Sequence, residues 1–386
     1  GPVVVVEHTT DNNLMKFRFT NASVRMLAAE ADFTLDGKSY RAGSFIIPSA
    51  DRARLDASLR ELGLTAVAVA AAPTVATHDL DIPRIGYVHA WQRTQDEGWV
   101  RAALDTYGVP YTYFADQKLK EGNLRAKYDV IVFPHVGGNA VSQVNGISRT
   151  SALPLPYKRT AATPNLGALD QSDDIRGGMG IEGLAELAKF VRSGGTLIVE
   201  GSTATIFPTF GLTSGITIEE PAALFARGSI MRGMIADKAS PIVYGYEGGQ
   251  LPVYFNQAPV ISAGGSGVPP QFAALLGGGG GPSQNITPMA GRLHLSPWEP
   301  DSSAARRASE GAQNEAANLR SMAAQFGINL DQGRPRVVMS FPTNPNDMLL
   351  SGTLQNGQLL SGRAQVVDAQ VGDGHVVMFA IRPFWR

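Results

Sequence analysis

Short apolar runs alternate with amphipathic stretches through the middle of the chain. The runs are bounded by turn residues and lie at residues 85–89, 111–114, 130–133 and 196–199. Between them, apolar residues recur at helical spacing around Trp99 and again around Leu187. Continuous apolar strands that alternate with helices are typical of a parallel sheet covered on both faces. The pattern predicts an α/β fold for residues 84–205, with a loop-like insertion at residues 139–180.

The first 82 residues predict a separate, small α/β unit. Its strands are expected at residues 3–6, 43–47 and 64–69, and residues 73–83 are predicted to be a linker. Asp36-Gly37 accepts the positive φ of a type I′ turn and indicates a hairpin. Two helices are expected, with the caps Asp11 for the first, Ser49 or Asp51 for the second, and Gly63 at the end of the second.

The second half of the chain combines an unusual insertion with further strands. Residues 248–291, a run of 44, hold no charged residue, and five of them are consecutive glycines. Gly and Pro break this run too often for a membrane helix, so we expect an insertion with a short strand at residues 251–255. A helix is predicted over residues 302–326. The last strands should complete the parallel-sheet domain, and they lie at residues 336–341, 364–371 and 375–381, with a hairpin at Asn356-Gly357.

These patterns divide the chain into four predicted segments. They are residues 1–82, a small α/β domain; 83–245, the first part of the parallel-sheet domain; 246–330, the uncharged insertion and a helix; and 331–386, the strands that complete the sheet. The chain begins with Gly-Pro rather than Met, and a buried strand follows at once. We therefore expect it to be a fragment of a longer polypeptide.

Composition narrows the class of protein. Of 386 residues, 33 are basic and 34 acidic, and no basic run occurs, which argues against a general nucleic-acid binder. An apolar content of 44% argues against disorder of the whole chain. No run of 18 apolar residues occurs, so no transmembrane helix is expected. The chain has no cysteine, which excludes disulfides, thiolate metal sites and a cysteine nucleophile.

Motifs for a metal or a nucleotide are missing from the sequence. The six histidines stand singly, without His-Glu-x-x-His or His-x-x-Glu, whereas a zinc site needs three or four converging ligands. The glycines at 277–281 lack the strand, helix and lysine of a phosphate-binding loop. Only Gly86 falls in the first strand, so no dinucleotide fingerprint is present. We expect no metal and no cofactor in this fragment.

One candidate nucleophile follows the strand at residues 196–199. Ser202 would stand at a strand-to-helix turn, where hydrolases expose a serine or cysteine. Such an elbow needs glycine two residues to either side, but Glu200 and Ala204 stand there. His375 is the only late histidine near a strand that could act as the base. The alternative is that Ser202 only caps the next helix.

Two histidines are predicted at the carboxyl ends of strands. His89 ends the first strand of the sheet and His135 follows the third. The carboxyl ends of parallel strands form the ligand crevice in open sheets, so a small-molecule site is one interpretation. Three further candidates follow His89 closely in sequence: Trp91, Asp96 and Glu97. The other interpretation is a loop network in which Thr94 and Asp96 only cap a helix.

Several motifs together resemble a known family. They lie at residues 11–15, 43–47, 83–91, 94–99, 124–131, 163–167 and 376–383. They resemble the region after the catalytic domain in a group of bacterial zinc carboxypeptidases, and the second domain is similar to a class I glutamine amidotransferase domain. This resemblance implies a flavodoxin-like sheet, an extracytoplasmic location (periplasmic or secreted), and zinc only in an upstream domain. The nucleophile of the amidotransferase family is a cysteine and its partner motif is His-x-Glu. Ser202 and His375-Val376-Val377 stand at these positions, and no zinc-ligand motif of the carboxypeptidase occurs. Neither the amidotransferase nor the carboxypeptidase catalytic residues therefore carry over to this chain.

Three functions follow as expectations. The first is a non-catalytic binding or scaffolding module, an accessory part of a larger assembly that docks through residues 248–291, because interface cores are depleted in charge; a surface loop is the alternative for this segment. The second is that these domains shape the site of an active zinc carboxypeptidase. The third is a serine hydrolase that uses Ser202. The expected binding residues are His89, Trp91, Asp96, Glu97, His135 and Ser202.

Overall fold

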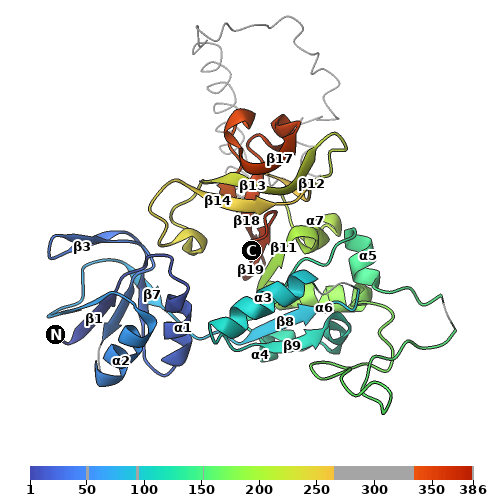
Figure 1. Ribbon diagram of the computed structural model, residues 1–386, viewed down its shortest axis with the longest axis horizontal. Helices are drawn as coiled ribbons and strands as arrows, with labels where there is room; N and C mark the ends of the chain where they lie inside the picture. The colour runs from blue at the N-terminus through green and yellow to red at the C-terminus, as the bar shows by residue number, and fades with distance from the viewer. Residues whose placement is uncertain (49–51, 93–94, 151, 265–333, 385–386) are drawn as a thin grey trace, which may run out of the picture. The chain divides into compact units, whose positions relative to one another are not determined.

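The computed structural model of the protein describes residues 1–48, 52–92, 95–150, 152–264 and 334–384. Within these residues the strands form a five-stranded sheet, a 12-stranded sheet and a separate hairpin (Figure 1). The mixed α/β class predicted from the sequence is confirmed. The helix predicted at residues 302–326 and the greater part of the uncharged stretch lie outside the described residues, as do the predicted caps Ser49, Asp51 and Thr94.

The N-terminal sheet is antiparallel throughout. Its strands are, in spatial order, β6 (Ala66–Val69), β1 (Val3–Val6), β5 (Phe45–Pro48), β2 (Leu27–Ala29) and β7 (Thr77–Asp79). Helices α1 (Asn13–Thr20) and α2 (Arg52–Leu62) share one buried core with this sheet. Apolar residues at alternate positions of β1 and β5 supply that core, because successive side chains of a strand point to opposite faces.

Local signals in the N-terminal part of the chain agree with the sequence in most places. The hairpin of β3 (Phe33–Leu35) and β4 (Lys38–Tyr40) is confirmed, with positive φ at both Asp36 and Gly37. The predicted cap of α1 is wrong by one residue: Asn12 is the N-cap, and the Asp11 carboxylate before it accepts from the backbone N–H of Asn13. Gly63 follows the end of α2 with φ of 66°, as predicted. The prediction of a linker is wrong at β7, whose side chains are all exposed and which is held by backbone pairing with β2.

Five strands of the larger sheet run parallel. They are, in spatial order, β9 (Thr112–Ala115), β8 (Ile85–His89), β10 (Val130–Phe133), β11 (Thr196–Glu200) and β19 (Gly374–Phe379). The first connection leads from β8 outward to β9, and the next returns to β10 on the other side of β8. The carboxyl ends of β8 and β10 therefore flank the point at which the strand order reverses, where open α/β sheets bind ligands.

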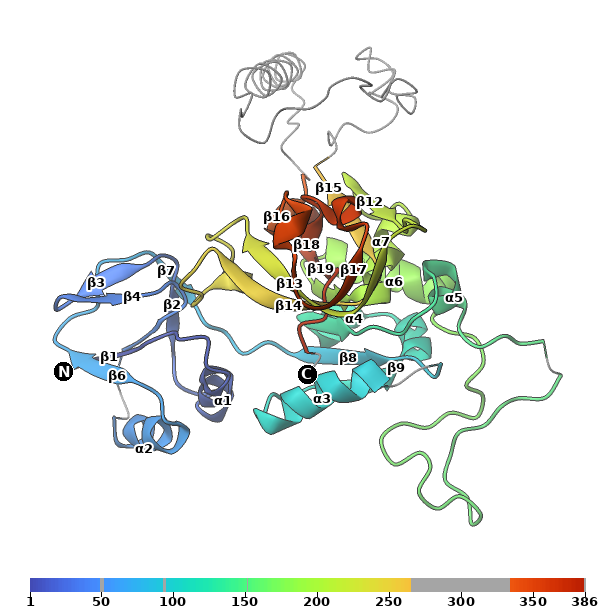
Figure 2. The same cartoon turned by 45° about the horizontal axis from the view of Figure 1, so that its top comes forward.

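Helices cover both faces of these parallel strands, as predicted. Helix α3 (Gln95–Thr106) packs Val100 and Leu104 against Tyr87 of β8. Helices α4 (Leu124–Lys127) and α6 (Gly180–Arg192) lie on the opposite face (Figures 1 and 2). No helix in the described part of the chain is long and apolar enough to cross a membrane.

Antiparallel strands extend the same sheet beyond β19. They are β18 (Ala364–Val371), β16 (Arg336–Ser340), β13 (Phe225–Ile235) and β14 (Gln250–Phe255), with β12 (Ile216–Glu219), β15 (Val260–Ala263) and β17 (Leu349–Gln355) joined at the side. The predicted strands at residues 251–255, 336–341 and 364–371 are confirmed, and β19 completes the parallel part. The hairpin predicted at Asn356-Gly357 is wrong, because β17 pairs with β13 and a 3₁₀ turn over Gly357–Leu360 follows it.

Candidate functional site

The predicted binding residues separate into two groups at the carboxyl ends of the strands. His89 and Trp91 line a cavity of about 420 Å³ beyond β8 and β9. Asp96, His135 and Ser202 meet beyond β10 and β11 instead. Glu97 does not line the cavity: its buried carboxylate pairs with Arg101 one turn along α3, 3.2 Å away, and it interacts with Tyr113, which does line the cavity. A binding role for Glu97 stays a prediction.

A long connection supplies the main polar partner of His89. It spans residues 146–179, between α5 (Ala140–Asn145) and α6, and brings Asp170 to the ends of β8 and β9. The Asp170 Oδ2 lies 3.0 Å from His89 Nε2 and accepts from the Ala115 N–H at 2.8 Å. Its Oδ1 accepts from Lys118 Nζ at 2.9 Å. Residues 139–180 were predicted to be loop-like throughout, which is wrong at α5, where the Asn139 side chain caps the helix.

Gln117 fixes the far end of this connection. Its side-chain Nε2 donates to the backbone carbonyls of Asp174, Arg176 and Gly177 at 2.8–3.0 Å. The connection is therefore tied to the segment after β9 at two places, by Asp170 and by Gln117. The connection has almost no regular secondary structure, but these side-chain hydrogen bonds hold it in place as one wall of the cavity.

The protonation of the His89–Asp170 pair follows from burial. Burial lowers the pKa of His89, and this effect outweighs the hydrogen bond with Asp170, which raises it. The imidazole is therefore neutral at neutral pH. Burial would raise the pKa of Asp170, but hydrogen bonds from His89 and Lys118 outweigh it and lower that pKa. A carboxylate can only accept, so Nε2 of His89 carries the proton and donates it. Nδ1 is then an acceptor, and it is buried without a hydrogen-bond partner among the described residues.

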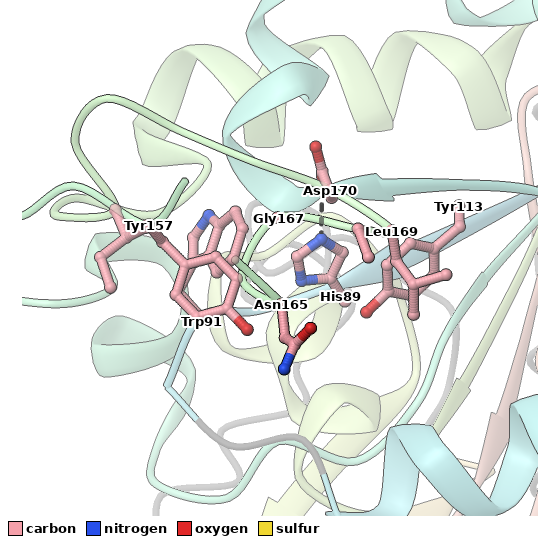
Figure 3. Close-up of a pocket in the computed structure, with 10 residues that line it drawn as sticks. His89, Trp91, Tyr113, Tyr157, Asn165, Gly167, Leu169 and Asp170 are labelled. Carbon is pink, nitrogen blue, oxygen red and sulfur yellow. Dashed lines mark hydrogen bonds and ion pairs between the residues drawn. The ribbon is translucent and has the colours of Figure 1, made fainter. Parts of the chain in front are cut away.

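Aromatic side chains enclose His89 (Figure 3). The Tyr113 ring stacks on the imidazole at 4.4 Å, and the guanidinium of Arg101 lies 4.5 Å from the centre of the same tyrosine ring. The Trp91 ring meets the imidazole edge to face at 4.7 Å with an angle of 83°. Tyr157 lies 5.0 Å from Trp91 at 50°. The Nδ1 of His89 points away from Asp170, toward the side on which Asn165 and Tyr157 lie.

The side chains of the second group form hydrogen bonds with one another and with the neighbouring backbone. The Ser202 Oγ accepts from the backbone N–H groups of Val136 at 3.2 Å and Gly137 at 2.7 Å. The Ser202 N–H donates to His135 Nδ1 at 2.9 Å. Arg382, which follows β19, lies 3.0 Å from His135 Nε2 and 2.9 Å from the Asp96 carboxylate. These contacts join the ends of β10, β11 and β19 to the start of α3.

Both interpretations of Ser202 need correction. Its predicted base, His375, pairs with Thr196 at the amino end of β11, whereas Ser202 follows the carboxyl end of that strand. The whole strand, about 13 Å at ~3.3 Å per residue, therefore lies between the two residues. His375 Nδ1 contacts Asp368 instead, at 2.8 Å. Ser202 is not the helix cap either, since Glu200 and Thr203 form the capping box of the 3₁₀ helix Gly201–Thr205.

Glu200 is a buried acid that sequence analysis named only as a departure from the elbow pattern. Burial raises its pKa to about 7, a backbone hydrogen bond from His135 opposes the rise, and the nearby Asp96 adds to it. Its Oε2 has no partner among the described residues. Within the same residues, no group of three or more His, Cys, Asp and Glu side chains could hold a metal ion.

Comparisons with known proteins find only distant similarities to solved structures. No protein-family model matches the chain, and no curated protein matches it. A β-galactosidase from Bacillus circulans sp. alkalophilus is 9% identical with a TM-score of 0.32, over 78% of this chain and 28% of that chain. A cytoplasmic protein from Salmonella typhimurium LT2 is 10% identical with a TM-score of 0.35, over 77% of this chain and 87% of that chain. A ThuA-like protein from Bacteroides uniformis is 7% identical with a TM-score of 0.32, over 77% and 80%. Similarities of this size assign the chain to none of these families.

Proposed function

We propose that this chain is a non-catalytic binding module, an extracytoplasmic accessory part of a zinc carboxypeptidase-like protein. The observation that carries the proposal is the state of Ser202. In a serine hydrolase the nucleophile donates its proton to a base, and neighbouring N–H groups remain free for the oxyanion. Here the Ser202 oxygen itself accepts the N–H groups of Val136 and Gly137. The corner that would carry catalysis therefore supports local structure.

The order of the parallel strands supports a finer description of the fold. Numbered along the chain, β8, β9, β10, β11 and β19 stand in the order 2-1-3-4-5, which is that of flavodoxin-like sheets. We infer a flavodoxin-like domain of the class I glutamine amidotransferase kind, extended by antiparallel strands. The zinc carboxypeptidase-like origin and the zinc upstream rest on the sequence resemblance. Intact zinc ligands upstream would favour the alternative, in which these domains shape an active carboxypeptidase site.

The place for a ligand is the cavity at His89. It combines a buried acceptor for which the described residues offer no partner, aromatic walls and a position beside the reversal of strand order. Docking of a protein partner through residues 248–291 stays a prediction, since most of that segment lies outside the described residues.

Labelling with a fluorophosphonate probe tests the non-catalytic character directly. The probe phosphonylates activated serines, and intact-mass spectrometry reads the adduct. We expect no added mass on the wild-type chain under conditions that fully label a serine hydrolase run in parallel. A single adduct that disappears in Ser202→Ala would refute the proposal.

A further inference from the structure

We propose that the His89 pocket, the cavity lined by His89, Trp91, Tyr157, Asn165 and Asp170, binds a neutral sugar ring. One ring hydroxyl would donate to His89 Nδ1. The inference rests on the proposed function, because it names the ligand class of the pocket that the binding module would use. Hydrogen bonding, charge and ring geometry each support it.

The hydrogen-bond argument concerns His89. His89 lines the cavity, and its side chain is 2% exposed. Its Nε2 proton is donated to Asp170, and its Nδ1 is buried without a partner among the described residues. Leaving a buried acceptor unpaired costs free energy, and a ligand with a donor recovers it. A hydroxyl is such a donor, and it can accept from another group at the same time.

The charge argument excludes an ionic ligand. Asp170 is the only carboxylate among the described lining residues, and both its oxygens are occupied. Its charge is balanced by Lys118 at 2.9 Å. Burial keeps His89 neutral. A charged ligand would lose its hydration without an opposite charge to pair with, whereas a neutral one loses less.

The geometry of the rings favours a puckered ligand over a flat one. A nucleobase binds best on an open aromatic face, often between two parallel faces. His89 and Arg101 already contact the Tyr113 ring. The remaining rings stand at steep angles, 83° between His89 and Trp91 and 50° between Trp91 and Tyr157. A sugar presents C–H groups in several directions and fits such a corner. The volume, about 420 Å³, suits a small ring ligand.

The test uses ligand-observed NMR of the whole chain against two named sets of probes. The first set is D-glucose, D-galactose, D-mannose, N-acetyl-D-glucosamine and their disaccharides; the second is adenosine and uridine. We expect saturation transfer to at least one sugar and to neither nucleoside. Transfer to a nucleoside alone, or to no sugar, would overturn the proposal.

Two variants locate the binding. His89→Gln keeps a donor toward Asp170 and removes the acceptor at Nδ1, so the affinity for the sugar should fall roughly tenfold. Tyr157→Ala removes one wall at a partly exposed position, so it keeps the test valid if the first variant unfolds. His78→Gln, on the N-terminal sheet, is the matched control and should bind like wild type. Unchanged binding in both pocket variants would overturn the proposal. A fluorophosphonate adduct on Ser202 would refute the proposed non-catalytic function even if sugars bind. Absence of sugar binding alone would refute the sugar site and leave the proposed non-catalytic function standing.

Discussion

Asp170 joins the long connection to the sheet, and its replacement tests how that wall is held. In Asp170→Ala, the buried Ala115 N–H and the His89 Nε2–H both lose their acceptor. A buried donor without a partner costs about 1–3 kcal/mol, so two of them set a range of about 2–6 kcal/mol. Detachment of the connection would hydrate both donors and limit this cost. We therefore expect a loss of about 3 kcal/mol at pH 7.

Asp170→Asn is the matched control. A single oxygen, Oδ2, takes both buried bonds, and the amide oxygen of asparagine can keep them. What is lost is the acceptor at Oδ1, which takes bonds from the half-exposed Lys118 amine and from the exposed Gln171 N–H. The ion pair with Lys118 is worth only about 1 kcal/mol, and water can replace the acceptor of the exposed Gln171 N–H. The asparagine variant should thus lie much closer to wild type than the alanine variant.

Urea unfolding followed by far-ultraviolet circular dichroism measures the global loss, and limited proteolysis within residues 152–175 measures local detachment. The pKa of Asp170 is lowered in the folded chain, so its contribution is present above the ordinary aspartate pKa and is lost as the pH falls through the folded value. The difference between wild type and Asp170→Ala should shrink accordingly in acid. If the alanine and asparagine variants match wild type in both assays at pH 7, the assigned role of Asp170 is wrong.

Two further substitutions probe the rest of the sheet. Burial raises the pKa of Glu200 to about 7, so the folded chain loses stability as the pH rises from about 4.5 to 7. Glu200→Gln should therefore be more stable than wild type by about 1–3 kcal/mol at pH 8 and should differ little from it at pH 4.5. Urea unfolding measures both differences, and equal effects at the two pH values would contradict this. A Cβ at Gly374 would meet the backbone carbonyls of Val191 and Gly195, so Gly374→Ala should lower the free energy of unfolding by about 1–3 kcal/mol. A Cβ at Gly98 on α3 would meet open space, so Gly98→Ala should not lose stability. Thermal melting that ranks the two variants in the opposite order would rule out this packing argument.

The sequence predicted the elements whose signals are local. The apolar runs of β8, β10 and β11 are enough to predict these strands. Because the carboxyl ends of parallel strands lie at one edge of a sheet, the sequence then places His89 and His135 at that edge. The rule cannot tell that the two histidines serve different groups. That division depends on Arg382, which arrives from the end of the chain and contacts His135 and Asp96.

The remaining features depend on long-range contacts. Asp170 lies 81 residues from His89 in a connection without periodicity, so no sequence signal joins the two. The exposed strand β7 has no apolar pattern, and only its backbone pairing with β2 defines it. Asn356-Gly357 has hairpin chemistry, but β17 finds its partner in β13, more than a hundred residues earlier.

The wall that carries Asp170 is one continuous connection between two helices, while His89 and Tyr113 belong to the strands beneath it. Asp170 ties it to the ends of β8 and β9, whereas the pairing of β8 with β9 and β10 is made by the backbones of these strands themselves. Chains that share this strand order but differ between residues 146 and 179 would then keep the histidine and change what it recognises. In this architecture the residues of the wall other than Asp170 can set selectivity, while Asp170 serves both the pocket and the fold.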